Sequence, residues 1–342
     1  MNPFNVSRPV CIIGLGLIGG SLLRDLAGKK HPVFGYNRST SGARRAARQG
    51  YDVDNDLSSV LTRAESEGAL IVIAVPFGAV ASVLDEIAQH APTCGITDVV
   101  SVKAPVYDLI RERGMESRYV GGHPMAGTAY SGWDNSQQGL FAGAAWAVTY
   151  DFAAELDAAG EKVPTEWTDL FADVVKLCSM AHAEAMPVRV GAHDEAVARV
   201  SHLPHVIAEA LAVVGDHGGI LSQSLAAGSF KDATRVAGTQ PPLVRQMCET
   251  NSEAVVKALD EFTELLSQAR AALTAEEPSI AQLADAGFAA RTRLEARSGA
   301  RKESVSPVKI SSRPVLRLSP GGHGWVGQLR QAESMGGRIE VF

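Results

Sequence analysis

A glycine-rich loop near the N-terminus constrains the fold of this chain more than any other feature. Val10–Ile13 is a short apolar run that predicts a buried strand, and Leu22–Leu26 predicts a helix. The G-x-G-x-x-G spacing between them permits a tight turn, lets a pyrophosphate approach the backbone and allows the helix to pack closely on the strand. The N–H groups at the helix start then favour phosphate. The loop predicts a dinucleotide site, in preference to a turn that serves packing alone. The expected contacts are Gly14, Gly16, Leu17, Ile18 and Gly19.

The end of the next predicted strand, Pro32–Tyr36, bears on which dinucleotide binds. An enzyme that uses NAD usually places Asp or Glu there, to accept hydrogen bonds from the ribose 2′-hydroxyl. This chain has a neutral, cationic and hydroxyl-rich stretch instead, which suits a 2′-phosphate because arginine binds phosphate through two parallel hydrogen bonds. A polar surface turn is the alternative interpretation. We expect NADP as cofactor, with NAD as the alternative. The residues assigned to it are Asn37, Arg38, Ser39 and Thr40.

Apolar strands and helices alternate through the first half of the chain. Ala69–Val75 predicts a long buried strand that Pro76 stops, Ile96–Val102 predicts another, and Met186–Val190 predicts the last one. This alternation predicts an α/β Rossmann-type domain, in which helices cover both faces of an open parallel sheet. The carboxyl end of the Ala69–Val75 strand adds Val75 and Pro76 to the expected cofactor contacts.

The 342 residues divide into three predicted parts. A dinucleotide-binding domain spans 1–190, an all-α substrate and dimerisation domain spans 191–298, and a linker with a short tail spans 299–342. The tail from Pro314 predicts strand–helix–strand, the shape of the first half of a small amino-acid-sensing ACT domain. Such a half domain cannot bury its own sheet face, so it must dock elsewhere or pair with another copy. A regulatory unit, a dimer arm and a disordered end all remain open for it.

Composition excludes several classes of protein. A net charge of −6 and an aromatic content of 6% argue against binding nucleic acid or an anionic membrane. The four cysteines form no C-x-x-C pair, which excludes a zinc ribbon or a disulfide framework and suits a reducing compartment. The N-terminus lacks the pattern of a signal peptide, and we find no run of about 18 apolar residues. We expect a cytoplasmic protein without a metal site.

Three further stretches carry reactive side chains. Ser101 follows a predicted strand, at the end where parallel sheets bind ligands. His123 stands between a glycine and a proline, which hold it on a rigid turn. His193 precedes Ser201–His205, whose two end residues lie one helical turn apart and share a face.

In these stretches the chain resembles the prephenate/arogenate dehydrogenase family of tyrosine biosynthesis. The motifs that carry the resemblance are GLGLIGGS at 14–21, SVK at 101–103, HPMAGT at 123–128, SHLPH at 201–205 and FKDATR at 230–235. The resemblance implies an N-terminal Rossmann domain and a C-terminal helical domain that forms a homodimer, with the active site between them. It implies oxidative decarboxylation of prephenate to 4-hydroxyphenylpyruvate, or of arogenate to tyrosine, with hydride transfer to NAD(P)⁺.

The resemblance also implies a role for each reactive side chain. His123 accepts the proton of the substrate's 4-hydroxyl, a task that suits an imidazole with a pKa near 6.5, and Ser101 is hydrogen-bonded beside it. Arg235 binds the ring carboxylate, and His205 lies near the substrate side chain. His193 shapes the pocket from the domain junction. The weakest of these assignments is Lys231, for which a solvated position at a helix end is an equal interpretation.

Two other functions remain open from the sequence. A β-hydroxyacid dehydrogenase has a similar succession of domains, but that function leaves HPMAGT and SHLPH unexplained. A dinucleotide-sensing module without catalysis would bind the cofactor and turn over no cyclohexadienol. Prephenate and arogenate differ only by a keto or an amino group on the side chain, and the sequence does not choose between them. It also leaves open whether tyrosine inhibits.

Overall fold

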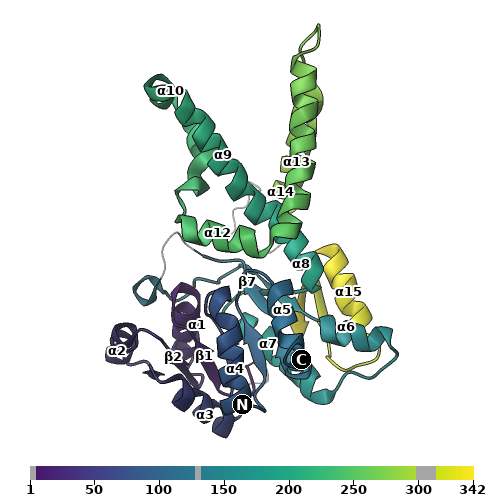
Figure 1. Cartoon of the computed structure of the whole chain (residues 1–342). Helices are drawn as coiled ribbons and strands as arrows, with labels where there is room; N and C mark the ends of the chain where they lie inside the picture. The colour runs from purple at the N-terminus through teal and green to yellow at the C-terminus, as the bar shows by residue number, and fades with distance from the viewer. Residues whose placement is uncertain (1–4, 128–131, 298–312) are drawn as a thin grey trace, which may run out of the picture. The chain divides into compact units, whose positions relative to one another are not determined.

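The structure is a computed structural model that describes residues 5–127, 132–297 and 313–342. The chain forms two compact units. The first contains Met1–His193 and Pro314–Phe342, and the second contains Asp194–Arg313. In Figure 1 the C-terminal segment, in yellow, lies beside elements of the N-terminal part of the chain.

A six-stranded parallel sheet with the order β3-β2-β1-β4-β5-β6 organises the first unit. The chain runs outward from β1 in one direction and then returns to β4 on the other side, which creates the topological switch point where such sheets bind ligands. The predicted α/β Rossmann-type fold is confirmed. The strands are β1 (Val10–Ile13), β2 (Val33–Tyr36), β3 (Val53–Asp54), β4 (Leu70–Ile73), β5 (Ile96–Asp98) and β6 (Tyr119–Val120).

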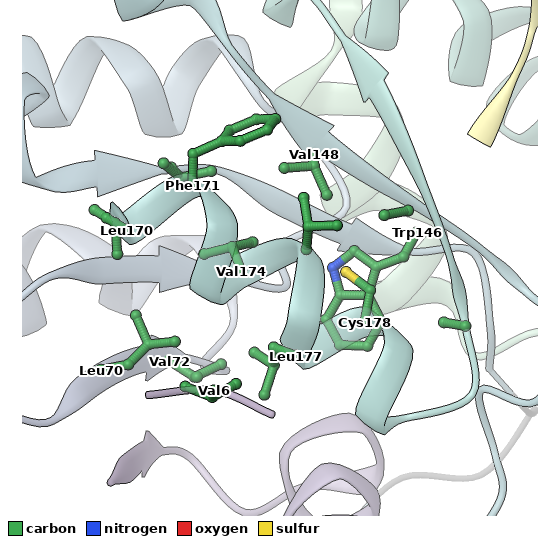
Figure 2. Close-up of a cluster of buried hydrophobic side chains, with 14 of the residues drawn as sticks. Val6, Leu70, Val72, Trp146, Val148, Leu170, Phe171, Val174, Leu177 and Cys178 are labelled. Carbon is green, nitrogen blue, oxygen red and sulfur yellow. The ribbon is translucent and has the colours of Figure 1, made fainter. Parts of the chain in front are cut away.

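Both faces of this sheet are buried, as an almost continuous apolar strand sequence requires. Successive residues of β1 alternate between two hydrophobic cores, with Val10 and Ile12 in one and Cys11 and Ile13 in the other. Figure 2 shows the first of these cores, where α7 packs against the sheet. The helices of the N-terminal segment of this unit are α1 (Leu17–Gly28), α2 (Thr40–Arg48), α3 (Leu57–Glu67), α4 (Val80–His90), α5 (Ala104–Arg111), α6 (Asp151–Ala158) and α7 (Thr165–Met180).

A second sheet corrects the expectation of a single parallel sheet. β7 (Gly122–Pro124) pairs antiparallel with β8 (Ala145–Thr149), which pairs parallel with β9 (Glu184–Val188). The chain leaves the large sheet at Gly121, whose N–H donates to Thr149 Oγ1 at 2.9 Å. The sequence across 119–124 does not reveal this break, because the strands on either side of it have only two and three residues.

The second unit is helical in its described part. α8 (Val190–Val197) begins in the first unit, which extends to His193, and continues through a π-helical turn at Ala198–His202 into α9 (Leu203–His217). This run, Val190–His217, is long and apolar enough to cross a membrane by length and composition alone, and a single helix of this kind is weak evidence for a membrane span. The remaining helices are α10 (Gly219–Leu225), α11 (Gly228–Thr234), α12 (Pro241–Thr250), α13 (Ser252–Leu273) and α14 (Ala281–Arg297).

The C-terminal tail has the predicted strand–helix–strand form. β10 (Val315–Leu318) and β11 (Arg338–Val341) pair in parallel, and α15 (Trp325–Met335) connects them. The tail packs within the first unit, where the ring centroids of Trp325 and Phe171 of α7 are 5.6 Å apart. Most of the linker predicted before the tail lies outside the described residues.

Candidate active site

The three glycines of the β1–α1 turn have different tasks. Gly14 has a φ of +104°, and a Cβ on it would lie 2.6 Å from the Ala74 carbonyl oxygen. A Cβ on Gly19 would lie 2.0 Å from the Gly14 carbonyl oxygen, whereas one on Gly16 would meet no atom within 4 Å. Packing therefore requires Gly14 and Gly19, and the open space over Gly16 fits a pyrophosphate. Gly16 is also the N-cap of α1 and has no side chain, so no side-chain cap occupies the N–H groups at the start of α1.

The turn after β2 carries the residues expected to choose the cofactor. Ser39 caps α2 by accepting a hydrogen bond from the Gly42 N–H at 3.2 Å, and Asn37 Oδ1 accepts one from the Ser39 N–H at 3.3 Å. Thr40 Oγ1 accepts from Asn55 Nδ2 at 3.0 Å. Arg38 is exposed. This turn presents a cation and hydroxyl groups, and it presents no carboxylate of its own.

The cofactor contacts predicted after β4, Val75 and Pro76, lie beside the glycine loop between β1 and α1. A Cβ on Gly14 would lie 2.9 Å from Val75 Cγ1, so Val75 borders the glycine loop directly. Pro76 follows it and is exposed. The two residues close the loop from the β4 side.

A buried ion pair underlies the region around Ser101. Asp98 ends β5, and its carboxylate pairs with Lys103; both side chains are 0% exposed. Tyr119 Oη donates to Asp98 Oδ2 at 2.6 Å, and Lys103 Nζ donates to the Gly122 carbonyl oxygen at 2.7 Å. Burial and the adjacent Asp98 carboxylate raise the pKa of Tyr119 well above its usual value, so this phenol stays protonated and donates. The network ties the half-buried Ser101 loop to the start of β7.

His123 lies on β7, directly after Gly122, whose carbonyl oxygen Lys103 binds, and it faces another histidine. Its Nδ1 is 2.9 Å from Nε2 of His193, and the two rings meet edge to face with centroids 5.1 Å apart. His193 lies in the first turn of α8 and is 3% exposed. The structure thus brings together two residues that the sequence placed in one site without predicting their bond. The expected bond from Ser101 to His123 remains a prediction.

The second unit holds the other expected substrate contacts. His205 lies half-buried on α9, and Arg235 lies exposed just after α11. Arg235 lies close enough to His205 for its charge to affect the pKa of the imidazole. Burial lowers the pKa of His205, and the Arg235 guanidinium lowers that pKa further. Lys231 lies exposed on α11. His202, in contrast, is buried with its Nδ1 3.2 Å from Asn251 Nδ2, as expected of a structural histidine.

The structure gives no candidate metal centre in the part of the chain that it describes: no group of three His, Cys, Asp or Glu side chains is arranged to hold an ion. The four cysteines are free thiols. Burial raises the pKa of Cys94 to about 12, so its thiol stays protonated.

Comparison with known proteins identifies the family. A model of the prephenate dehydrogenase nucleotide-binding domain matches residues 20–176, and a model of the prephenate dehydrogenase dimerization domain matches residues 190–299. The cyclohexadienyl dehydrogenase of Zymomonas mobilis is 31% identical over 80% of this chain and 90% of its own. The chain belongs to the prephenate dehydrogenase family.

Solved structures agree with this membership. A Corynebacterium glutamicum protein assigned as a prephenate dehydrogenase is 55% identical, with a TM-score of 0.91 over 99% of this chain and 100% of its own. The Aquifex aeolicus prephenate dehydrogenase, solved with hydroxyphenyl propionate and NAD⁺, is 25% identical, with a TM-score of 0.70 over 84% of this chain and 98% of its own.

Family membership makes this chain an oxidoreductase of tyrosine biosynthesis. It catalyses the oxidative decarboxylation of prephenate or arogenate with a nicotinamide dinucleotide as hydride acceptor. The dimerization-domain match also supports a homodimer. Sequence reasoning missed two parts of the site, the Asp98–Lys103 pair and the His123–His193 bond. The first had a signal, because Asp98 and Lys103 interrupt an otherwise apolar stretch.

Proposed function

We propose that His123 is the general base of this dehydrogenase and that NADP is its preferred cofactor. The observation that carries the first assignment is the 2.9 Å contact between His123 Nδ1 and His193 Nε2. A general base needs a fixed ring orientation and a defined tautomer, and a hydrogen bond to its other nitrogen supplies both.

That contact determines which nitrogen of each histidine carries a hydrogen. For Nε2 of His123 to accept a proton, Nδ1 must carry hydrogen and donate to His193 Nε2, which leaves the proton of neutral His193 on its own Nδ1. When His123 takes the proton of the substrate 4-hydroxyl, the resulting imidazolium stays stabilised because Nδ1–H still donates to a neutral acceptor. His123 returns that proton to the same oxygen as the ring becomes a phenol.

The hydride and the carboxylate carbon leave the ring in the same reaction. The bound nicotinamide supplies the acceptor for the hydride that leaves C4 of the ring. The bond from C1 to its carboxylate carbon breaks, CO₂ departs, and the electron pair completes the aromatic ring. Ser101, in our proposal, donates or accepts a hydrogen bond beside His123 and fixes the 4-hydroxyl.

The substrate's anionic groups require cations in the site. We assign the ring carboxylate to Arg235, whose guanidinium matches a carboxylate with two parallel hydrogen bonds. We place His205 near the side chain, where the lowered pKa keeps its imidazole neutral and able to both donate and accept. Lys231 adds positive charge on the adjacent helix α11.

The cofactor assignment rests on the turn after β2. Arg38 and the hydroxyl groups of Ser39 and Thr40 suit a 2′-phosphate, and Asn37 stands where an NAD enzyme usually has a carboxylate. The pyrophosphate is assigned to the glycine loop. We further propose a cytoplasmic location, which suits four free thiols.

One substitution with a matched control tests the general base. His123→Asn should lower kcat about 10²–10⁴-fold, as the loss of a general base does, and should leave cofactor binding unchanged. His182→Asn is the control, because His182 is exposed and has a φ of +58°, a conformation that asparagine tolerates well. The assay follows reduced cofactor by fluorescence with prephenate and then with arogenate. Near-normal turnover by His123→Asn would remove His123 from the mechanism.

A second measurement tests the cofactor. KM for NADP should be lower than KM for NAD in the wild-type enzyme, and Arg38→Gln should raise the first value while leaving the second nearly unchanged. A wild-type preference for NAD would refute the assignment.

A further inference from the structure

The C-terminal tail, Pro314–Phe342, lies beyond both family domain models, which end at residues 176 and 299. It nevertheless belongs to the core of the first unit. Trp325, Val326, Leu329 and Ala332 of α15 are all buried in the same hydrophobic cluster as α7. One face of α15 thus anchors the tail, and the polar side chains beside that face are held in fixed positions.

Glu333 of α15 uses that fixed position to reach the start of α8. Its Oε1 accepts a hydrogen bond from the Arg189 N–H at 2.8 Å. Its Oε2 accepts a hydrogen bond from the hydroxyl of Tyr150. Burial and the Glu333 carboxylate raise the pKa of Tyr150, so the phenol stays protonated and remains a donor.

A continuous series of contacts runs from Glu333 to the proposed base. The Arg189 carbonyl oxygen accepts the His193 N–H at 2.8 Å, and His193 Nε2 contacts His123 Nδ1 at 2.9 Å. The peptide groups of Arg189 are therefore held on one side by the tail and on the other by the histidine that orients His123.

Two carboxylates share the task of capping α8. Asp151 Oδ2 accepts the Val190 N–H at 2.9 Å, and Asp151 Oδ1 accepts the Nε–H of Arg189 at 2.7 Å. The first N–H groups of a helix need such partners, and negative charge there also suits the helix dipole. Asp151 comes from α6, at the start of that helix. Glu333 comes from the tail, so the tail supplies one of the two carboxylates.

We propose that the C-terminal tail is a positioning element for the dehydrogenase reaction and that Glu333 is its positioning residue, which holds the first turn of α8 so that His193 meets His123. This inference rests on the proposed role of His123. Glu333 contacts no reactant. It acts on the fraction of enzyme molecules in which His123 has the productive orientation and tautomer. Loss of Glu333 should therefore lower kcat and change the pH dependence of kcat/KM. It should leave KM for the cyclohexadienol substrate and for the cofactor nearly unchanged.

Three variants of the full-length enzyme test this. Glu333→Ala removes both hydrogen bonds and should lower kcat about 10-fold, because small misplacements of catalytic groups are costly. Glu333→Gln should restore most of that activity, since its amide oxygen can accept from the Arg189 N–H and its amide NH₂ can donate to Tyr150 Oη. Arg330→Ala is the matched control on the same helix. It breaks a 2.7 Å ion pair with Asp157 of α6 without touching the start of α8, so kcat should stay within twofold of wild type.

Each outcome decides the inference. A loss confined to Glu333→Ala, rescued by Glu333→Gln and accompanied by a shifted pH profile, supports it. Equal kcat and equal pH profiles for Glu333→Ala and Arg330→Ala would overturn it, because the tail would then contribute packing alone. If Glu333→Ala does not fold, Tyr150→Phe decides instead. That variant removes one of the two contacts of Glu333, and it should lower kcat about twofold to threefold with the same direction of pH shift; wild-type values would overturn the inference.

The failure of this inference differs from the failure of the proposed function. Full activity of His123→Asn would refute the general base itself. An inactive His123→Asn together with a wild-type Glu333→Ala would refute only the role of the tail.

Discussion

The residues around the proposed base in the first unit and the cations of the second unit are held in different ways. In the first unit, His193 is 3% exposed and Asp98 and Lys103 are fully buried, each with partners at hydrogen-bond distance. In the second unit, Arg235 and Lys231 are exposed on short helical segments. The surroundings of the proposed base in the first unit are preorganised within one chain, whereas the second unit presents its cations on a surface.

The apolar side chains show the same contrast. The first unit buries its large hydrophobic residues in two extensive cores, and the described part of the second has one small core of a few residues. Most of the large hydrophobic residues that are exposed belong to the second unit, with Ile220 at 83% exposure and Phe288 at 76%. Apolar surface of this extent marks an interaction site. The second unit is also the part of the chain that matches the dimerization-domain model, and exposed apolar side chains suit the interface of a homodimer.

The largest expected effect is on the free energy of unfolding, when one lysine in each unit is replaced by methionine. Lys103→Met leaves the Asp98 carboxylate buried without its cation and should lower the free energy of unfolding by about 3–5 kcal/mol. Lys231→Met, at an exposed position, should change it by less than about 0.5 kcal/mol. Denaturant titration of both variants measures the difference.

A double substitution serves as the control for that experiment. Asp98→Asn combined with Lys103→Met removes the stranded charge and should recover part of the lost stability. Equal, small effects of the two lysine substitutions would contradict the description of the first unit as preorganised by buried charge.

The same contrast explains what could be predicted from the sequence. The Rossmann-type sheet was predictable, because strands buried on both faces are continuous apolar runs and the glycine loop marks the first turn. The departure of β7 from that sheet was not, since only Gly121 separates β7 from β6 and both strands are too short to show a pattern of their own. The all-α character of 191–298 was also predicted, although α14 has no buried residue to give it an apolar stripe.

The sequence indicates candidate site residues but not the contacts between them. Motifs identified Ser101, His123 and His193 as candidates. The bond between the two histidines joins residues 70 positions apart, and the contact from Glu333 to the Arg189 N–H spans 144 positions. Local patterns carry no information on such pairs, because the pairs depend on how α8 and α15 dock and not on the propensities of either helix.

A smaller effect should distinguish binding from chemistry in the second unit. If Arg235 holds the ring carboxylate in both the ground state and the transition state, Arg235→Gln should raise substrate KM about 10–100-fold and change kcat only slightly. The control is Arg245→Gln, which breaks an exposed ion pair with Glu249 on α12 and should leave both constants unchanged. A fall in kcat at constant KM would show that Arg235 acts on the transition state alone.

The smallest expected effect tests whether the charged side chains around His205 in the second unit influence its pKa. Burial and the Arg235 cation lower the pKa of His205, while the Glu209 carboxylate opposes them. Since the folded enzyme resists protonation of His205 more than the unfolded chain does, the unfolded chain binds the extra proton below pH 6.5, and stability from this residue falls as pH drops through that value. Titration of the His205 ring by NMR should show a higher pKa in Arg235→Gln than in wild type and a lower one in Glu209→Gln. Identical titrations in all three proteins would mean that solvent screens these charges completely, and that the second unit, unlike the first, holds its functional residues without electrostatic coupling.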